Sequence, residues 1–591
     1  MTVHCIGNGR VCVYGKGTEI FQAFGPDYSS PEAFRLREEA APCTLAAAET
    51  KTEKISRIAF RHVGPGREIF DYIPPGPAAF TRRINGSARF IVSFENGRIS
   101  PSPFDDTVIA ITRPGAPSYI YEFENSIPHA YTSSRFRYTA FRYEGAVRCV
   151  ALSDSEMRIE TEGEALLLFA FAPTPESLSG QLEDAREAVR SIRNYGDPRL
   201  FPETDIGVAG DHPYRKAIAD GYDVIAAQQS DAGSVLAGYN YHLSYVRDNY
   251  GVFRFLLAAG AYPRARRMLD YYVKVFREYG RIQNAQGMTE YAFHVHENDN
   301  VEITGYLVLM FTSYYAATGD NAMLAEGRAL IEYCLRAQHG SMTRGMLTFN
   351  GDETYIAGGF LPRSALNDGS AEATALYHKA ISGILLCASQ GAAALSRATE
   401  DCIKADLAEI ERCFGKRFFG ADGTFYCNCP DSGFAPLIRP GGPLQCGHGF
   451  GMSYRNGNGD YVCPDCFRRE LPPLFPGLYG RRFTTEAAIL SPAFAEAGLI
   501  PDDKAKSTAL KVLSELPSRE RFVGYEYGMA MFAAGFDAGT AAKMLSLRDE
   551  FGAWSEYYER GALSGTLCRP WETAVNLAAL IETFRRAGCG V

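Results

Sequence analysis

Two glutamates, each in a turn rich in aromatic residues, are the side chains of this sequence best suited to acid–base chemistry. Glu353 lies in Gly-Asp-Glu-Thr-Tyr at 351–355, and Glu556 lies in Gly-Ala-Trp-Ser-Glu-Tyr-Tyr at 552–558. Both turns lie beside long segments with helical periodicity. Hydrolysis of a glycosidic bond uses two carboxyl groups, of which one stays protonated near neutral pH and the other ionised. The pair therefore predicts an enzyme that cleaves sugars.

A third glutamate is an alternative to Glu556. Glu526 lies between Tyr525 and Tyr527 in the segment Val-Gly-Tyr-Glu-Tyr-Gly at 523–528. Its carboxylate could activate water as a general base. The same segment equally suits the start of an inner helix.

Two further polar segments could bind a sugar. Arg247 and Asp248 follow Tyr245 at the start of a helical pattern, where they could form only a helix cap and a surface ion pair. At the rim of a pocket, the two side chains would supply fixed donors and acceptors for neighbouring sugar hydroxyls. Asp299 and Glu302 lie in a segment dense in hydrogen-bonding groups, and they equally suit the capping box of the next helix.

Residues 424–482 form an insertion rich in cysteine and glycine, unlike any other segment of the chain. Its candidate zinc ligands are Cys427, Cys429, Cys446, His448, Cys463 and Cys466. The Cys-Pro-Asp-Cys pair predicts a tight knuckle, and a second pair of ligands would complete a closed, structural zinc site. The favoured ligands are Cys427, Cys446, Cys463 and Cys466, with Cys429 and His448 as substitutes. Unliganded thiols in a loop and a redox dithiol are the alternatives.

The elements that must position these residues change type near residue 200. Residues 1 to about 172 show short alternating or apolar runs, separated by turns such as Asn85-Gly86 and Asn96-Gly97. This pattern predicts an antiparallel β-sandwich. A charged helix at 175–194 and a proline-containing segment at 195–204 are expected to link the sandwich to the rest of the chain.

From about residue 212 the apolar residues recur with the period of an α-helix. Helical patterns lie at 212–229, 243–260, 262–279, 299–318, 321–338, 369–389, 395–413, 484–498, 502–516, 524–534, 537–547 and 570–588. Such a series suggests a closed double ring of inner and outer helices, with a pocket at the ends of the inner ones. We therefore expect a multidomain chain: a sandwich with its linker helix at 1–200, an all-α barrel at 201–591, and the zinc-binding insertion at 424–482 within the barrel.

Composition narrows the class of protein. The 591 residues are too many for one hydrophobic core, so two or three domains are expected. The formal charge of −9 argues against nucleic-acid binding, which needs a basic face. Neither a signal peptide nor a membrane span is visible, and 15 cysteines do not resemble a secreted disulfide framework. We expect a cytoplasmic protein without an organic cofactor.

In the order of these segments the chain resembles the glucoamylase-like family of inverting α-glycosidases, glycoside hydrolase family 15. The landmarks of the resemblance are the segments 245–248, 299–302, 351–355 with Gly369-Ser370, and 552–556 with Arg569-Pro570-Trp571. The family pairs an N-terminal β-sandwich with an (α/α)6 barrel, and the resemblance covers the layout of residues 212–591. The chain departs from the family in having Tyr355 in place of Trp in the acid turn, few Trp overall, and a cysteine-rich insertion.

The resemblance implies a role for each of these segments. Glu353 would be the general acid that protonates the leaving oxygen, and Glu556 would be the general base that activates water on the opposite face of the sugar ring. The residues expected to hold the sugar or line the pocket are Tyr245, Arg247, Asp248, Asp299, Glu302, Arg569 and Trp571. The substrate would be a small, α-linked oligosaccharide or glycoside, and the departures bear on this substrate more than on the chemistry.

Three other functions remain open for a barrel of this kind. A polysaccharide lyase would abstract a proton from a uronic acid, and a sugar phosphorylase would use phosphate in place of the base and water. A non-catalytic carbohydrate-binding protein would keep the pocket but not the acid. The presence of both Glu353 and Glu556 argues against the phosphorylase and the binding protein.

Overall fold

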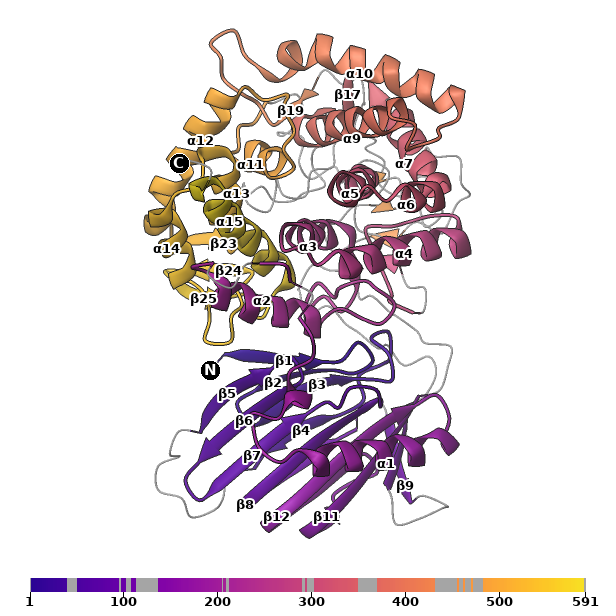
Figure 1. Ribbon diagram of the computed structural model, residues 1–591, viewed down its shortest axis with the longest axis vertical. Coiled ribbons are helices and arrows are strands. Elements are labelled where there is room, and N and C mark those ends of the chain that lie inside the picture. The colour runs from indigo at the N-terminus through magenta and orange to yellow at the C-terminus, as the bar shows by residue number, and fades with distance from the viewer. Residues whose placement is uncertain are drawn as a thin grey trace.

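The computed structural model combines an N-terminal β-sheet with a larger helical part (Figure 1). The structure describes residues 2–39, 50–94, 97–101, 108–112, 137–204, 206–208, 212–289, 293–294, 302–348, 369–430, 454–455, 461–462, 469–470 and 482–588. Within these residues, no helix is both long enough and apolar enough to cross a membrane.

Among the described residues, twelve antiparallel strands form the N-terminal sheet. They are β1 (Val3–Gly7), β2 (Cys12–Lys16), β3 (Glu19–Phe24), β4 (Arg35–Glu38), β5 (Lys51–Ser56), β6 (Ala59–Gly64), β7 (Arg67–Tyr72), β8 (Ala79–Ser93), β9 (Gly97–Pro101), β10 (Val108–Thr112), β11 (Arg137–Ala151) and β12 (Glu156–Ala172). One edge of β8 pairs with β12 along its whole length. The other edge is shared by β7 and β4, so the sheet branches at β8.

Apolar side chains from the two branches meet in one core. Ile6 and Val13 of the first strands cluster with Phe60 and Ile69 of β6 and β7. The N-terminal part is therefore antiparallel β-structure around its own core, as the sequence predicted.

The prediction of a turn at Asn85-Gly86 is wrong. Both residues lie inside β8, where Gly86 pairs with Gly163 of β12. Gly86 has a φ of +121°, which a residue with a Cβ rarely adopts. The glycine permits a local irregularity, and the strand continues because neighbouring strands pair with it on both edges.

Helix α1 (Glu176–Ser191), expected as a linker, covers one face of the sheet. Its buried residues include Leu178, Leu182 and Val189, whose spacing of four and seven residues forms one apolar stripe. Leu168 of β12 packs in the same cluster, whereas the adjacent Phe169 faces the other core. Alternation along β12 thus gives the sheet two buried faces.

The helical part follows the expected periodicity closely. Its helices are α2 (Arg215–Ala227), α3 (Val246–Ala258), α4 (Tyr262–Tyr279), α5 (Glu302–Thr318), α6 (Asn321–Glu326), α7 (Arg328–Gly340), α9 (Ala371–Ser389), α10 (Arg397–Phe418), α11 (Ala487–Phe494), α12 (Asp502–Glu515), α13 (Glu526–Ala534), α14 (Ala538–Ser546) and α15 (Pro570–Gly588). Its short strands are β13 (Ser244–Tyr245), β14 (Ala285–Gln286), β15 (Phe293–His294), β16 (Met342–Thr343), β17 (Met346–Thr348), β18 (Gly369–Ser370), β19 (Asn428–Cys429), β20 (Tyr454–Arg455), β21 (Tyr461–Val462), β22 (Arg469–Glu470), β23 (Arg521–Val523), β24 (Tyr557–Glu559) and β25 (Ala562–Ser564).

Among the described helices, α3, α5, α9, α11, α13 and α15 form an inner ring. Each packs against the next, and α15 packs against α3, so the ring closes. Helices α2, α4, α7, α10, α12 and α14 pack on the outside of this ring (Figure 1). The contact that closes the ring is tight, because a Cβ on Gly251 of α3 would lie 1.9 Å from the ring of Trp571 in α15.

The sheet and the ring meet through a segment that leads to α3. The Tyr28 hydroxyl donates a hydrogen bond to the carbonyl oxygen of Ala227, at 2.6 Å. His242 stacks on Phe24 with 3.6 Å between ring centroids, and its Nε2 lies 2.8 Å from the Tyr28 carbonyl oxygen. Burial lowers the pKa of His242 to about 3, so the ring is neutral and Nε2–H donates. The N-terminal sheet therefore fixes the chain just before α3.

Candidate active site

Glu556 is a buried carboxylate held by one donor on each oxygen. It lies just before β24 and is 7% exposed. The Tyr241 hydroxyl donates to Oε1 at 2.9 Å, and the backbone N–H of Thr566 donates to Oε2 at 2.9 Å. The backbone N–H of Glu556 also donates to the carbonyl oxygen of Thr566, and its carbonyl oxygen accepts from the N–H of Gly524. These contacts fix the position of the carboxylate.

Arg569, directly before α15, joins several parts of the site. Its Nη2 lies 3.2 Å from Oδ1 of Asp248, and its Nε lies 3.0 Å from Oε2 of Glu572. Its Nη1 donates to the carbonyl oxygen of Ala237. The guanidinium lies over the ring of Tyr241, with 4.9 Å to the ring centroid. Arg569 thus connects the first turns of α3 and α15 with the tyrosine that binds Glu556.

Burial and crowding of like charges perturb the acids of this cluster. Burial raises the pKa of Glu572 to about 8, although the Arg569 guanidinium opposes the rise. Burial also raises the pKa of Asp248, again against Arg569 and Arg247. For Arg569, burial would lower the pKa, but the neighbouring carboxylates of Glu572, Asp248 and Glu556 raise it well above its usual range. Charges fixed in a site that largely excludes water interact strongly with a bound substrate.

The start of α3 places Tyr245, Arg247 and Asp248 together. All three are less than a tenth exposed, so Arg247 and Asp248 are not a surface pair. Tyr245 is the residue before the helix, and its ring meets that of Tyr241 edge-on at 6.1 Å. Oδ1 of Asp248 is buried and paired with Arg569, and it makes no hydrogen bond to the described residues. This oxygen can therefore accept a hydrogen bond from a ligand.

Trp571, expected to line the pocket, lies in the packing between inner helices. It is 2% exposed and meets Phe494 and Tyr525 edge-on, at 6.1 and 5.4 Å. Gly251 of α3 lies against its ring. This placement favours a role in closing the inner ring.

Glu526, the alternative base, has a different set of partners. It lies in the first turn of α13, where Oε2 accepts from the backbone N–H of Val523 at 2.7 Å and Oε1 accepts from Arg519 at 3.0 Å. Burial raises its pKa to about 7, against the effects of these two donors. Both glutamates are thus held by a donor on each oxygen; Glu556 is favoured as the base because one of its donors is Tyr241, over which Arg569 lies.

Several predicted residues cannot be placed. Glu353 and Asp299 lie outside the described residues, and Glu302 begins α5 with a side chain that is likewise not described. Tyr241 and Glu572 were not among the residues predicted for the site. The spacing of three residues between Arg569 and Glu572 at a helix start was the available signal for the second.

The zinc prediction rests mostly on residues that are not described. Cys446, His448, Cys463 and Cys466 lie outside the described residues. Cys427 and Cys429 are buried at β19, which pairs with β18 at the start of α9. In the described ranges, no group of three or more His, Cys, Asp or Glu side chains could hold a metal ion. The structural zinc therefore stays a prediction.

We expect about one zinc ion per chain in protein purified without added metal, because a four-ligand site binds one ion. Elemental analysis by mass spectrometry measures this directly. Chelation should lower the melting temperature, since metal affinity contributes to folding stability. A metal-free protein with an unchanged melting temperature would contradict the prediction.

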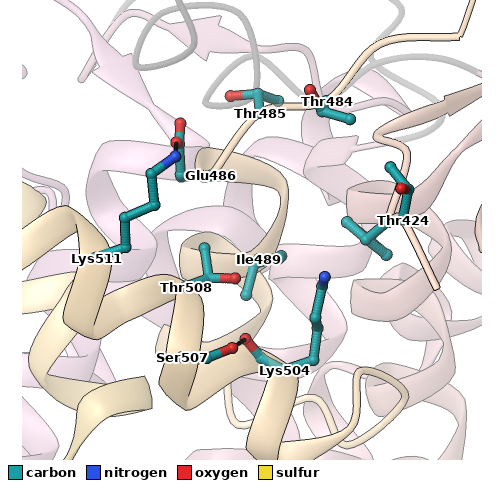
Figure 2. Close-up of a pocket in the computed structure, with 10 residues that line it drawn as sticks. Thr424, Thr484, Thr485, Glu486, Ile489, Lys504, Ser507, Thr508 and Lys511 are labelled. Carbon is teal, nitrogen blue, oxygen red and sulfur yellow. Dashed lines mark hydrogen bonds and ion pairs between the residues drawn. The ribbon is translucent and has the colours of Figure 1, made fainter. Parts of the chain in front are cut away.

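Figure 2 shows a separate pocket of about 360 Å³ between α11, α12 and residues 424–425. Its walls carry mainly hydroxyl groups and two lysines, and Lys511 forms an ion pair with Glu486 at 3.2 Å. The pKa of Glu486 is lowered: burial would raise it, but hydrogen bonds from its own backbone N–H and from Lys511 outweigh that effect. None of the residues that line this pocket is a predicted site residue, so it is not the candidate active site.

Comparisons with known proteins identify the fold. No family model and no curated protein matches the sequence. A bacterial glucoamylase solved in complex with acarbose is 12% identical, with a TM-score of 0.66, over 99% of this chain and 94% of that chain. The chain has the glucoamylase fold.

Two other solved structures are similar over smaller parts of the chain. A putative kojibiose phosphorylase from the human microbiome is 11% identical, with a TM-score of 0.44, over 72% of this chain and 69% of its own. A metal-independent α-mannosidase of Streptococcus pneumoniae is 10% identical, with a TM-score of 0.42, over 63% and 94%. The glucoamylase fold, which extends over nearly the whole of both chains, confirms the fold that the order of the sequence landmarks implied.

Proposed function

We propose that this protein is an inverting glycoside hydrolase that cleaves small α-linked oligosaccharides or glycosides. One observation carries the proposal: Glu556 is buried, is held on both oxygens, and lies beside the Arg569–Asp248 pair in a glucoamylase fold. The site lies where the first turns of the inner helices α3 and α15 meet. The helical pattern of the sequence predicted a pocket at these ends of the inner helices.

Glu556 acts as the general base. Its two donors fix the carboxylate in place, where it can take a proton from a water molecule. Glu353 is the general acid that protonates the leaving oxygen. Inversion requires room for the attacking water, so the two carboxyl groups should lie roughly 6.5–9.5 Å apart.

The other charged groups hold the terminal sugar. Asp248 has a buried oxygen that makes no hydrogen bond to the described residues and can accept one from a sugar hydroxyl. Tyr245 and Arg247 lie at the same helix start, and Glu302 is the first residue of the next inner helix, α5. Asp299 lies outside the described residues and is included from its place in the sequence. Each nitrogen of the Arg569 guanidinium has a contact with the protein, so the orientation of the group is fixed beside Asp248.

A screen of aryl glycosides and short oligosaccharides, with and without inorganic phosphate, tests the proposal. We expect release of free sugar that does not depend on phosphate. Formation of a sugar 1-phosphate would make the protein a phosphorylase, and an unsaturated product would make it a lyase. Binding without turnover would make it a carbohydrate-binding protein.

The cytoplasmic location and the domain boundary near residue 200 stay predictions.

A further inference from the structure

Glu572 is a buried acid that the proposed mechanism does not use. It lies in the first turn of α15, and its side chain is 1% exposed. Its carboxylate Oε2 lies 3.0 Å from Nε of Arg569, three residues earlier in the chain. The backbone of Gly524, before α13, packs so closely that a Cβ there would meet Cγ of Glu572. A carboxylate so enclosed has little freedom to move, and it is well placed to hold another side chain still.

The side chain that it holds is the flexible one in this cluster. An arginine has several rotatable bonds, and its planar guanidinium orients other groups only when its plane is fixed. In Arg569 the three nitrogens have three different partners: Nε meets Glu572, Nη2 meets Asp248 and Nη1 meets Ala237. Of these, Glu572 is on the same helix start and binds the nitrogen nearest the aliphatic stem. It therefore sets the direction in which the other two nitrogens point.

The position of Arg569 matters to the base through Tyr241. The guanidinium lies over the Tyr241 ring, and the hydroxyl of that ring donates to Oε1 of Glu556 at 2.9 Å. A guanidinium over an aromatic face is an attractive contact, so it helps to fix the ring. A chain of contacts thus runs from Glu572 through Arg569 and Tyr241 to Glu556, with a branch from Arg569 to Asp248.

We propose that Glu572 is a positioning residue of the active site: through Arg569 it orients Asp248, which binds the sugar, and Tyr241, which holds the base. The inference rests on the proposed hydrolase function. Glu572 touches neither water nor sugar in this role. Its contribution is the fixed acceptor at Nε, so an acceptor of the same reach matters more than the charge itself.

The variants Glu572→Gln and Glu572→Asp separate the reach of the side chain from its carboxyl group. Glutamine keeps an acceptor at the same distance, whereas aspartate keeps the carboxyl group but is one methylene shorter. We expect Glu572→Gln to lose roughly 10-fold and Glu572→Asp roughly 100-fold in kcat/KM, the range for altering a hydrogen bond to a charged group. KM should rise because Asp248 is misplaced, and kcat should fall because Glu556 is misplaced. A merely structural role would reduce the amount of folded enzyme and leave the KM of the remaining enzyme unchanged.

A double-mutant cycle with Tyr241→Phe tests the path to the base. If Glu572 acts through Tyr241, the losses in kcat should not add, because residues in one network show coupling. The double variant should be at least about threefold more active than the product of the two single losses predicts. If Glu572→Gln does not fold, Glu572→Asp can take its place in the same cycle.

Glu582→Gln is the matched control. Glu582 lies on the same helix and is paired with Arg585 three residues away, at 2.8 Å, but this pair is at the surface. Its replacement should leave kcat and KM unchanged.

Glu556→Ala, measured alongside, separates the positioning role of Glu572 from the proposed role of Glu556 as the base. If Glu556→Ala is inactive while both Glu572 variants keep wild-type constants, or if the cycle is additive, the positioning role is wrong. If Glu556→Ala is fully active, the proposed base is wrong.

Discussion

Replacing Glu556 by alanine should lower the rate of hydrolysis by roughly 10²–10⁴-fold, the contribution typical of a general base. The structure gives the reason. The two oxygens of Glu556 are each held by a donor, so the carboxylate occupies a fixed position that the alanine variant loses. The measurement is kcat with the best substrate found in the glycoside screen.

The matched control for this variant lies three residues along the chain. Glu559, on strand β24, is exposed and forms a weak ion pair with Arg521 at 3.6 Å. Glu559→Ala should keep wild-type activity and stability, because exposed ion pairs contribute little. Full activity in Glu556→Ala would reject this residue as the base, and Glu526 would be the next to replace.

The stereochemistry of the product tests how Glu556 acts. A base that activates water gives a product of inverted anomeric configuration, whereas a nucleophile gives retention through a covalent intermediate. NMR of the first-formed sugar should show inversion. Retention, or a glycosyl ester trapped on Glu556, would overturn the inverting mechanism but leave the glycosidase class intact.

Replacing Glu353 by glutamine should abolish hydrolysis of substrates with poor leaving groups and spare activated ones. An alcohol leaving group needs a proton to depart, whereas a group such as an activated phenolate departs with little protonation. The variant and the wild type should be compared on an oligosaccharide and on an activated aryl glycoside of the same sugar. The activated substrate serves as the internal control for folding and sugar binding.

An equal loss on both substrates would show that Glu353 is not the acid and acts only in positioning. Because Glu353 lies outside the described residues, this experiment is the direct test of its role as the acid. Together with Glu556→Ala, it assigns the two carboxyl groups to opposite steps of one reaction.

Local pattern determined the helices almost completely. The segments expected at 262–279 and 570–588 are helices α4 and α15, with the same boundaries. In both, proline stands in the first turn, where it needs no hydrogen-bond acceptor. The segment at 321–338 was expected as one helix but divides at Gly327. A Cβ on Gly327 would collide with the ring of Phe311, and a sequence pattern cannot show such a contact between helices.

The sheet was less predictable, for a physical reason. Asn85-Gly86 has the local signature of a hairpin turn, yet it lies inside a strand that pairs on both edges. Pairing partners far away in the sequence outweighed local turn preference. The packing of Trp571 between inner helices was not predictable from local sequence either, because its neighbour Gly251 lies in another helix, α3.

The sequence by itself determined which residue types the site could use: carboxyl groups in aromatic turns, an Arg-Asp pair at a helix start, and an arginine before the last helix. It also determined the order of the helices along the chain. Only the tertiary structure decided which of these residues touch. Tyr241 and Glu556 are 315 residues apart in sequence, and Arg569 meets Asp248 because α15 closes the ring against α3. Periodicity describes one helix at a time, whereas burial and ion pairing depend on the packing of all of them.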